Sequence, residues 1–211
     1  MTVLVIGGGA SGMAAALTAA EAGHRILLAE RQSRVGRKLL ATGNGRCNLS
    51  NLHASPAHYH GAAVDFCRPA LERFPSEETL GWFERLGLLT AAEPSGRVYP
   101  ASNMAGSVLD VLRYALERPE IELRTGCVIT QLRHRGGAFT ARTESGETLT
   151  AERVILAAGG AAGSRVGGVM DGYQLAKQLG HHRTALLPSL VQMKTDPTYP
   201  RGLKGVKAEA D

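Results

Sequence analysis

The sequence contains few cysteines. Among its 211 residues there are three, Cys47, Cys67 and Cys127. Their number is odd and no two of them stand in CxxC spacing, which argues against a disulfide framework, a redox dithiol and a cysteine-based zinc site. We expect three reduced thiols.

Long apolar runs are also missing. No stretch reaches the roughly 18 uninterrupted apolar residues of a membrane-spanning helix. The first 22 residues are apolar, but no charged segment precedes them and three glycines at 7–9 interrupt them, so we expect no secretory signal. The sequence predicts a globular, cytoplasmic protein without a membrane partner, and its 44% of hydrophobic residues can bury one substantial core.

The sequence has no run of charges of one sign. Its 24 Lys and Arg residues are scattered among 19 Asp and Glu residues, for a formal net charge of +5. The densest basic group, Arg31, Arg34, Arg37 and Lys38, lies beside a predicted phosphate-binding turn, so a bound anionic cofactor accounts for it. Only the net charge supports a tRNA-modifying role, and the dispersed charges count against it. We therefore expect no nucleic-acid partner.

The apolar pattern predicts an α/β fold. Residues 2–6 and 25–30 are predicted as buried parallel strands, joined by an Ala-rich helix over 10–22. After a long Gly- and Asn-rich loop over 31–62, the pattern predicts helices over 64–74, 76–86 with Ser76 as N-cap, 105–117 and 171–179, a hairpin over 88–100, strands over 120–124 and 153–158, and a β-meander over 127–133, 138–143 and 147–150. This order resembles the Rossmann-like FAD-binding domain of the glutathione-reductase type, a parallel sheet with helices plus a three-stranded β-meander.

A glycine-rich turn follows the first predicted strand. Residues 7–12 (GGGASG) fit the pattern GxGxxG between a strand and a helix. Gly7 allows the tight turn, Gly9 lets a pyrophosphate approach the backbone, and Gly12 lets the helix pack on the strand. Glu30 ends the second strand, where a carboxylate can accept hydrogen bonds from ribose hydroxyls. We predict that these four residues hold the ADP part of a dinucleotide.

A second glycine-rich loop favours a flavin over a nicotinamide as the remainder of that dinucleotide. Residues 36–48 (GRKLLATGNGRCN) follow soon after Glu30, where a simple NAD-binding domain would continue into another helix. A flavin needs such a loop, because its ribityl and isoalloxazine groups extend well beyond the first helix terminus.

The same loop carries a family resemblance. The stretch GRKLLATGNGRCNLSN at 36–51 resembles the signature loop of the BaiN/RdsA group of NAD(P)/FAD-dependent oxidoreductases, the YhiN-like flavoproteins that include aminoacetone-oxidase-like enzymes. Further matches are GRVYP at 96–100 with Ser102, AAGG at 157–160, DGY at 171–173, and LGH at 179–181 with Pro188. The resemblance extends through nearly the whole chain.

The resemblance implies a set of contacts with FAD, and NAD(P)H as a candidate electron donor. Gly7, Gly9, Ala10 and Gly12 would hold the pyrophosphate, with Ser11 of the same turn as a further cofactor-binding residue, while Glu30 and Arg31 would face the adenosine ribose. The flavin side would be lined by Lys38, Thr42, Gly43, Asn44, Gly45 and Arg46. Val128 would contact adenine through its backbone, Ala157 and Gly159 would pass close to the cofactor, and Asp171 would lie near the ribityl end. The resemblance assigns no catalytic residue.

The chain departs from this family at two places. Residues 161–165 (AAGSR) replace a serine-aromatic-proline step. Family members continue through an inserted β-rich domain before they complete the FAD-binding domain, whereas this chain stops at Asp211. We therefore expect an incomplete FAD-binding domain over 1–186 and the start of an inserted substrate domain over 187–211.

Several residues allow simpler interpretations. Cys47 is expected to be a small packed residue beside the cofactor rather than a redox thiol. His53, His58, His60, His181 and His182 lack metal-ligand spacing and are expected to be solvated. Arg97 and Tyr99 either face a substrate or cap a hairpin, and Trp82 is expected in the core.

Two function classes remain. One is an FAD-dependent oxidoreductase that transfers a hydride through flavin N5 and acts on a small molecule, by reduction of an enone with NAD(P)H or by oxidation of a small amine. The other is a non-catalytic, truncated dinucleotide-binding module. The pattern does not distinguish between oligomeric states.

Overall fold

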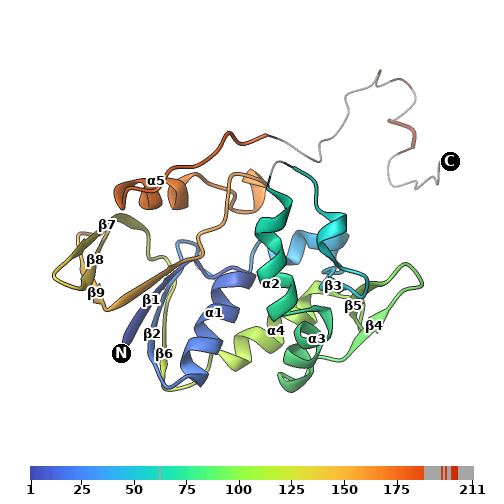
Figure 1. Cartoon of the computed structure of the whole chain (residues 1–211), viewed down its shortest axis with the longest axis horizontal. Coiled ribbons are helices and arrows are strands. Elements are labelled where there is room, and N and C mark those ends of the chain that lie inside the picture. Colours follow the sequence, from blue (N-terminus) through green and yellow to red (C-terminus); the bar gives the residue numbers. More distant parts are fainter. Residues whose placement is uncertain (62, 188–195, 197, 199–200, 204–211) are drawn as a thin grey trace.

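A four-stranded parallel sheet forms the centre of the fold. The computed structural model describes residues 1–61, 63–187, 196, 198 and 201–203 (Figure 1). The sheet has the order β10-β1-β2-β6, and every neighbouring pair is parallel. Its strands are β1 (Thr2–Ile6), β2 (Arg25–Ala29), β6 (Ile121–Arg124) and β10 (Arg153–Leu156).

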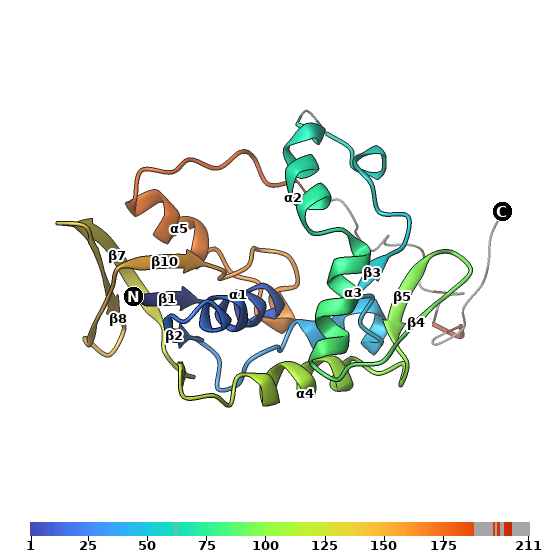
Figure 2. The ribbon, with the colours of Figure 1, turned by 60° about the horizontal axis from the view of Figure 1, so that its bottom comes forward.

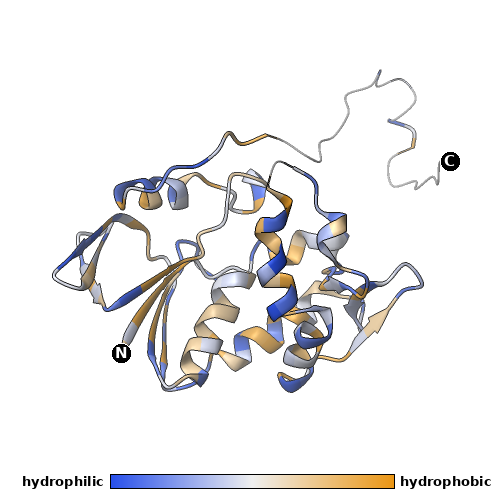
Figure 3. Cartoon of the chain, viewed as in Figure 1, coloured by the Kyte–Doolittle hydropathy of each residue, from blue (hydrophilic) through white to orange (hydrophobic). Residues whose placement is uncertain are grey.

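Alternate residues of the central strands enter two different cores. In β1, Val3 and Val5 pack against helices α1 (Ala10–Glu21) and α4 (Ala105–Ala115), whereas Leu4 and Ile6 face the opposite side. That side is covered by the meander and by α5 (Asp171–Gln178). Because both faces of β1 and β2 are buried, their sequences are continuous apolar runs rather than alternating ones. Figure 3 shows this concentration of hydrophobic residues in the parallel strands and α1, with mostly hydrophilic residues on α5.

A three-stranded meander lies between β6 and β10 in the chain. It consists of β7 (Ile129–Arg135), β8 (Ala138–Thr143) and β9 (Thr148–Ala151), all antiparallel. Gly136 and Gly137 both adopt positive φ in the first turn, which is the type of turn that two-residue hairpins favour.

A second lobe lies beside α1 and is built on a small sheet of order β3-β5-β4. Its strands are β3 (Ser50–Asn51), β4 (Thr90–Ala92) and β5 (Arg97–Pro100), and its helices are α2 (Arg68–Arg73) and α3 (Ser76–Arg85). Short 3-10 turns occupy Leu39–Gly45, Pro56–His58, Val64–Cys67 and Ser164–Val166. Helix α4 extends beneath both lobes and contacts α1, the 39–45 turn and β5 (Figure 2).

The predicted α/β fold with its β-meander is confirmed. Two local expectations need correction. The 31–62 segment is not a plain loop, because residues 50–51 pair with β5 as strand β3. Ser76 is not the N-cap of α3, since the helix already includes Ser76, and its hydroxyl donates instead to the carbonyl oxygen of Asn51. Most of the predicted second domain over 187–211 lies outside the described residues, so that boundary stays a prediction.

Within the part of the chain that the structure describes, no helix has both the length and the apolar character required to cross a membrane.

Candidate functional site

Three glycines shape the turn between β1 and α1, each for a different reason. Gly7 has φ of +109°, and a Cβ there would lie 2.4 Å from the carbonyl oxygen of Ala157. A Cβ on Gly12 would lie 1.7 Å from the carbonyl oxygen of Gly7, whereas one on Gly9 would meet no atom of the described residues within 4 Å. The first and third glycines are therefore required by the packing of the chain itself. The middle glycine faces open space that a ligand can enter, as GxGxxG predicts.

The N-terminus of α1 is left without a side-chain cap. Gly9 occupies the N-cap position, no side chain of the described residues caps the helix, and the first turn contains no acidic residue. The first backbone N–H groups of a helix have no partner inside the helix, and the helix dipole adds positive potential at this end. The terminus is therefore suited to a phosphate group.

Glu30 is a buried carboxylate beside this turn, with 8% of its surface exposed. Its Oε2 accepts a hydrogen bond from the Gly8 backbone N–H at 2.6 Å, and its Oε1 accepts one from the Gln32 N–H at 2.7 Å. An ionised carboxylate has about four acceptor positions. Two positions remain for the hydroxyls of a ribose.

The segment after β2 is attached to the same turn. The Gly36 N–H donates to the Gly8 carbonyl oxygen at 2.8 Å, and Gly36 has φ of +73°. A Cβ at Gly36 would lie 2.2 Å from Leu109 Cδ1. The backbone N–H and the carbonyl group of Gly8 are thus both held by residues 30–36, which fixes the geometry of the turn.

One large cavity of about 970 Å³ joins these groups. Its volume is at the upper end of the usual range for small-molecule sites. The predicted site residues that line it are Gly7, Gly9, Ala10, Ser11, Glu30, Arg31, Lys38, Thr42, Val128, Ala157, Gly159 and Asp171. Gly12 lies beneath the turn, in contact with Gly7.

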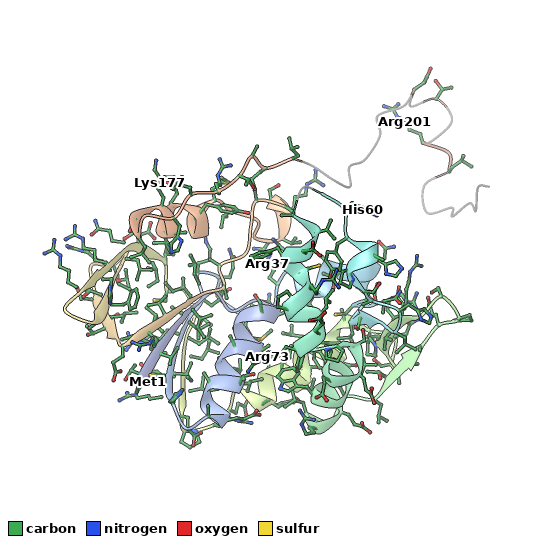
Figure 4. All side chains as sticks on the ribbon, viewed as in Figure 1. Met1, Arg37, His60, Arg73, Lys177 and Arg201 are labelled. Atoms are coloured by element: carbon green, nitrogen blue, oxygen red, sulfur yellow. The ribbon has the colours of Figure 1, made fainter. Side chains whose placement is uncertain are left out.

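All four residues of the dense basic group also line the cavity. Arg34, Arg37 and Lys38 line it together with Arg31. The Arg37 guanidinium donates to Gln32 Oε1 at 3.0 Å and to the Arg165 carbonyl oxygen at 3.3 Å, and Figure 4 shows Arg37 between α2 and the segment that leads to α5. Lys38 Nζ lies 3.4 Å from the Gly160 carbonyl oxygen. All these acceptors are neutral, so the two side chains keep their charges for an anion.

The structure separates Arg46 and its neighbours from the cavity. Gly43, Asn44, Gly45 and Arg46 are not among its lining residues. The Arg46 guanidinium instead lies 3.8 Å over the Tyr99 ring, pairs with Glu93 at 2.6 Å and donates to Asn103 Oδ1. Tyr99 is buried and is itself held by this stacking, whereas Arg97 of the same strand is exposed.

Asp171 lies beside Arg31 rather than alone. Its Oδ2 is 2.7 Å from Arg31 Nη1, which joins the start of α5 to the end of β2. The resemblance implies that Arg31 faces the adenosine ribose and that Asp171 lies near the ribityl group. The ion pair puts both side chains at the same part of the cavity wall.

Aromatic side chains that were not predicted as site residues also line the cavity. Phe74, Trp82 and Phe83 contribute to its wall. Trp82 was expected in the core; it is half-buried, stacks edge-on against Phe83 with ring centroids 5.0 Å apart, and packs against the core as well. Its helical spacing pointed to packing but contained no signal for a cavity.

Cys47 is buried in the cavity wall. Burial raises the pKa of its thiol, and the hydrogen bond with Thr42 offsets this only in part. A raised pKa keeps the thiol protonated and weakly nucleophilic at neutral pH. Over the described part of the chain, no cluster of three or more His, Cys, Asp or Glu side chains has the geometry of a metal site.

The fold and the cavity define the class of protein: a Rossmann-like dinucleotide-binding domain of the FAD-binding type found in flavin-dependent oxidoreductases. The chain belongs to the HI0933-like family, whose Rossmann-domain model matches residues 1–199.

Two curated relatives are similar to the chain in sequence over most of its length. The chain is 39% identical over 208 residues to the 3-dehydro-bile acid delta(4,6)-reductase of Clostridium scindens, covering 98% of this chain and 50% of that protein. It is 29% identical over 177 residues to the ribosomal RNA dihydrouridine synthase of Escherichia coli, covering 84% of this chain and 44% of that protein. The chain thus spans about half the length of the curated relatives it matches.

Solved structures share the fold at low identity. A flavocytochrome c3 fumarate reductase in its open conformation matches with a TM-score of 0.57 and 20% identity, over 84% of this chain and 40% of that one. THI4 of Thermovibrio ammonificans matches with a TM-score of 0.50 and 16% identity, over 85% of this chain and 62% of that one.

Proposed function

We propose that this chain binds FAD through its ADP half and forms the cofactor-binding part of an FAD-dependent oxidoreductase that acts on a small molecule. The observation that carries the proposal is the combination of an open Gly9, an uncapped α1 N-terminus and a preorganised Glu30 around one cavity.

The residues present fit the cofactor in shape and charge. The space above Gly9 admits a pyrophosphate, and the free acceptor positions of Glu30 suit the ribose hydroxyls. The cationic lining residues are Arg31, Arg34, Arg37, Lys38 and Arg85, and the acidic ones are Glu21, Glu30 and Asp171. The excess of two cations matches the two negative charges of a pyrophosphate. Thr42 and Lys38 would lie on the flavin side.

A flavin bound here would supply the redox chemistry, exchanging a hydride at N5 with NAD(P)H or with an organic substrate. The chain's own residues hold and orient the cofactor. The backbone N–H groups of α1 stabilise the phosphates, and the aromatic wall of Phe74, Trp82 and Phe83 supplies apolar surface beside the cradle.

The names of both curated relatives describe the same kind of bond chemistry. A reductase of delta(4,6) bile acids and a dihydrouridine synthase each add hydrogen across a carbon–carbon double bond. This supports reduction of an unsaturated substrate, such as an enone, over oxidation of an amine. The name of the 29% identical relative gives ribosomal RNA as the substrate, whereas that of the 39% identical relative gives a bile acid. The proposal follows the more similar relative, with a small-molecule substrate and no nucleic acid.

A second candidate is a nucleotide-binding module that takes only the ADP half. It is favoured by the position of residues 43–46, which were assigned to the flavin but lie outside the cavity wall. In this case the chain binds ADP as tightly as FAD.

Titration with FAD and with ADP separates the two candidates. Trp82 is the only tryptophan of the chain and lines the cavity, so its emission reports binding of either ligand, while flavin fluorescence reports on the isoalloxazine. We expect saturable binding of both ligands, tighter for FAD, and loss of both in Gly9→Glu, whose carboxylate would occupy the phosphate position. Equal affinities would support the module, and absence of binding would contradict both candidates.

A further inference from the structure

The ion pair between Arg31 and Asp171 lies next to the carboxylate that would hold the ribose. Arg31 directly follows Glu30, and its Nη1 is 2.7 Å from Asp171 Oδ2 across 140 positions of the chain. All three side chains line the same cavity. Asp171 is the first residue of α5, so the N-terminus of this helix places the carboxylate beside the end of β2.

Two dinucleotide classes differ at this position, since one has a free 2′-hydroxyl on the adenosine ribose and the other a 2′-phosphate. An acid at the end of the second strand accepts a hydrogen bond from the hydroxyl, whereas a nearby arginine accommodates the phosphate. This chain has both residue types in succession. Glu30 alone therefore does not decide which dinucleotide class binds, because an unpaired Arg31 would attract the 2′-phosphate that Glu30 repels.

Because of the neighbouring charges, Asp171 decides whether Arg31 can attract a 2′-phosphate. Among the described residues, the partners of the Arg37 guanidinium are the neutral oxygens of Gln32 and Arg165, and the lining of the cavity already contains more cations than acids. The Asp171 carboxylate neutralises Arg31, the residue that directly follows Glu30. Its removal would leave Arg31 free to make charge-assisted hydrogen bonds with a phosphate.

We propose that Asp171 is a specificity-determining residue: by pairing with Arg31 it makes the adenosine end of the site reject dinucleotides with a 2′-phosphate. The inference builds on the proposed function, since it concerns the same cofactor site. One consequence is that NADP(H) is refused at this site and could act as an electron donor only by docking elsewhere.

The experiment compares ADP with 2′-phospho-ADP as ligands of the 1–211 chain, by calorimetry or Trp82 emission. In the unchanged protein we expect ADP to bind more tightly by on the order of tenfold or more, the ratio that about 1.4 kcal/mol of discrimination produces. In Asp171→Asn, which keeps the size of the side chain, we expect this ratio to fall by about tenfold through tighter binding of 2′-phospho-ADP.

Two further variants separate specificity from folding. Arg31→Gln combined with Asp171→Asn should lose the gained affinity for 2′-phospho-ADP, because the gain comes from the released guanidinium. Asp110→Asn removes the carboxylate of another exposed ion pair, with Arg113 at 3.7 Å, away from the cavity, and should leave the ratio unchanged.

The outcomes distinguish this inference from the proposed function. If the unchanged protein binds neither ligand, both are overturned. If it binds ADP but does not discriminate, or if Asp171→Asn leaves the ratio unchanged, only the role of Asp171 is overturned. If Asp171→Asn does not fold, as judged by circular dichroism, Arg31→Gln alone decides: it must retain ADP binding and still reject 2′-phospho-ADP, and a loss of either contradicts the inference.

Discussion

The carboxylate of Glu30 accepts a buried hydrogen bond of 2.6 Å from the backbone N–H of Gly8, 22 positions earlier in the chain. The bond ties the end of β2 to the phosphate-binding turn. Glu30 therefore orients the turn, and in the proposed function it would also offer its remaining acceptor positions to a ribose.

Replacement of Glu30 by glutamine should weaken both roles. The amide has only one oxygen, so one of the N–H groups of Gly8 and Gln32 loses its acceptor, at a cost of about 1–3 kcal/mol in the free energy of unfolding. ADP affinity should fall by on the order of tenfold or more. Urea unfolding and calorimetric titration measure the two effects. Glu122→Gln, the same change in a half-buried carboxylate of β6, is the matched control and should leave ADP affinity unchanged.

Two glycines of the same motif should respond differently to alanine. The Cβ of Gly12→Ala would lie 1.7 Å from the Gly7 carbonyl oxygen, so α1 must move away from the turn, and we expect destabilisation of about 1–3 kcal/mol or more. The Cβ of Gly9→Ala meets no atom within 4 Å, and the residue has φ of −77°, which alanine readily adopts. Thermal unfolding should therefore separate the two variants clearly. Equal loss of stability would contradict the account of the turn.

Arg46 should stabilise its loop without contributing to ADP binding. Arg46→Lys loses the planar stacking on Tyr99 and the shared hydrogen bonds to Glu93 and Asn103, which we expect to cost about 1 kcal/mol. A double-mutant cycle with Glu93→Gln should show a coupling of roughly 0.2–1 kcal/mol, since the pair is partly exposed to solvent. ADP affinity should stay the same. A large loss of ADP affinity would show that Arg46 contributes to the binding site after all.

The stability of the protein should fall above about pH 9. Burial raises the pKa of Cys47 and of Cys127 above their ordinary value of 9.0. The unfolded thiols lose their protons first, so the folded state is fully favoured below this pH and loses stability as the pH rises through the raised values. Urea unfolding between pH 8 and 10 should show the decline. The decline should be smaller in a Cys47→Ala/Cys127→Ala variant; an identical decline would assign it to other groups.

Most of the fold could be predicted because its signals are local. The apolar runs at 2–6 and 25–30, the glycines between the first strand and helix, and the paired glycines at 136–137 each act on their immediate neighbours through backbone sterics and strand burial. Strand β3 escaped prediction because two residues contain no period. Ser76 was misplaced because a distant carbonyl, that of Asn51, competes for its hydroxyl.

The candidate site likewise has one part that local sequence predicts and another part that tertiary contacts decide. Within the first 30 residues, the sequence by itself indicated the predicted phosphate-binding turn and its carboxylate, because Gly12 packs on Gly7 and Glu30 bonds to the nearby Gly8. The contact that excludes a Cβ at Gly7 comes instead from Ala157, in the segment after β10. Only the tertiary structure decided the directions of the long cationic side chains. Arg46 turns to Tyr99 and Glu93, and Arg31 turns to Asp171, because the partners that offer a ring or a carboxylate arrive from elements 47 to 140 positions away. A flexible side chain takes the direction of its best partner, and local sequence does not specify where that partner lies.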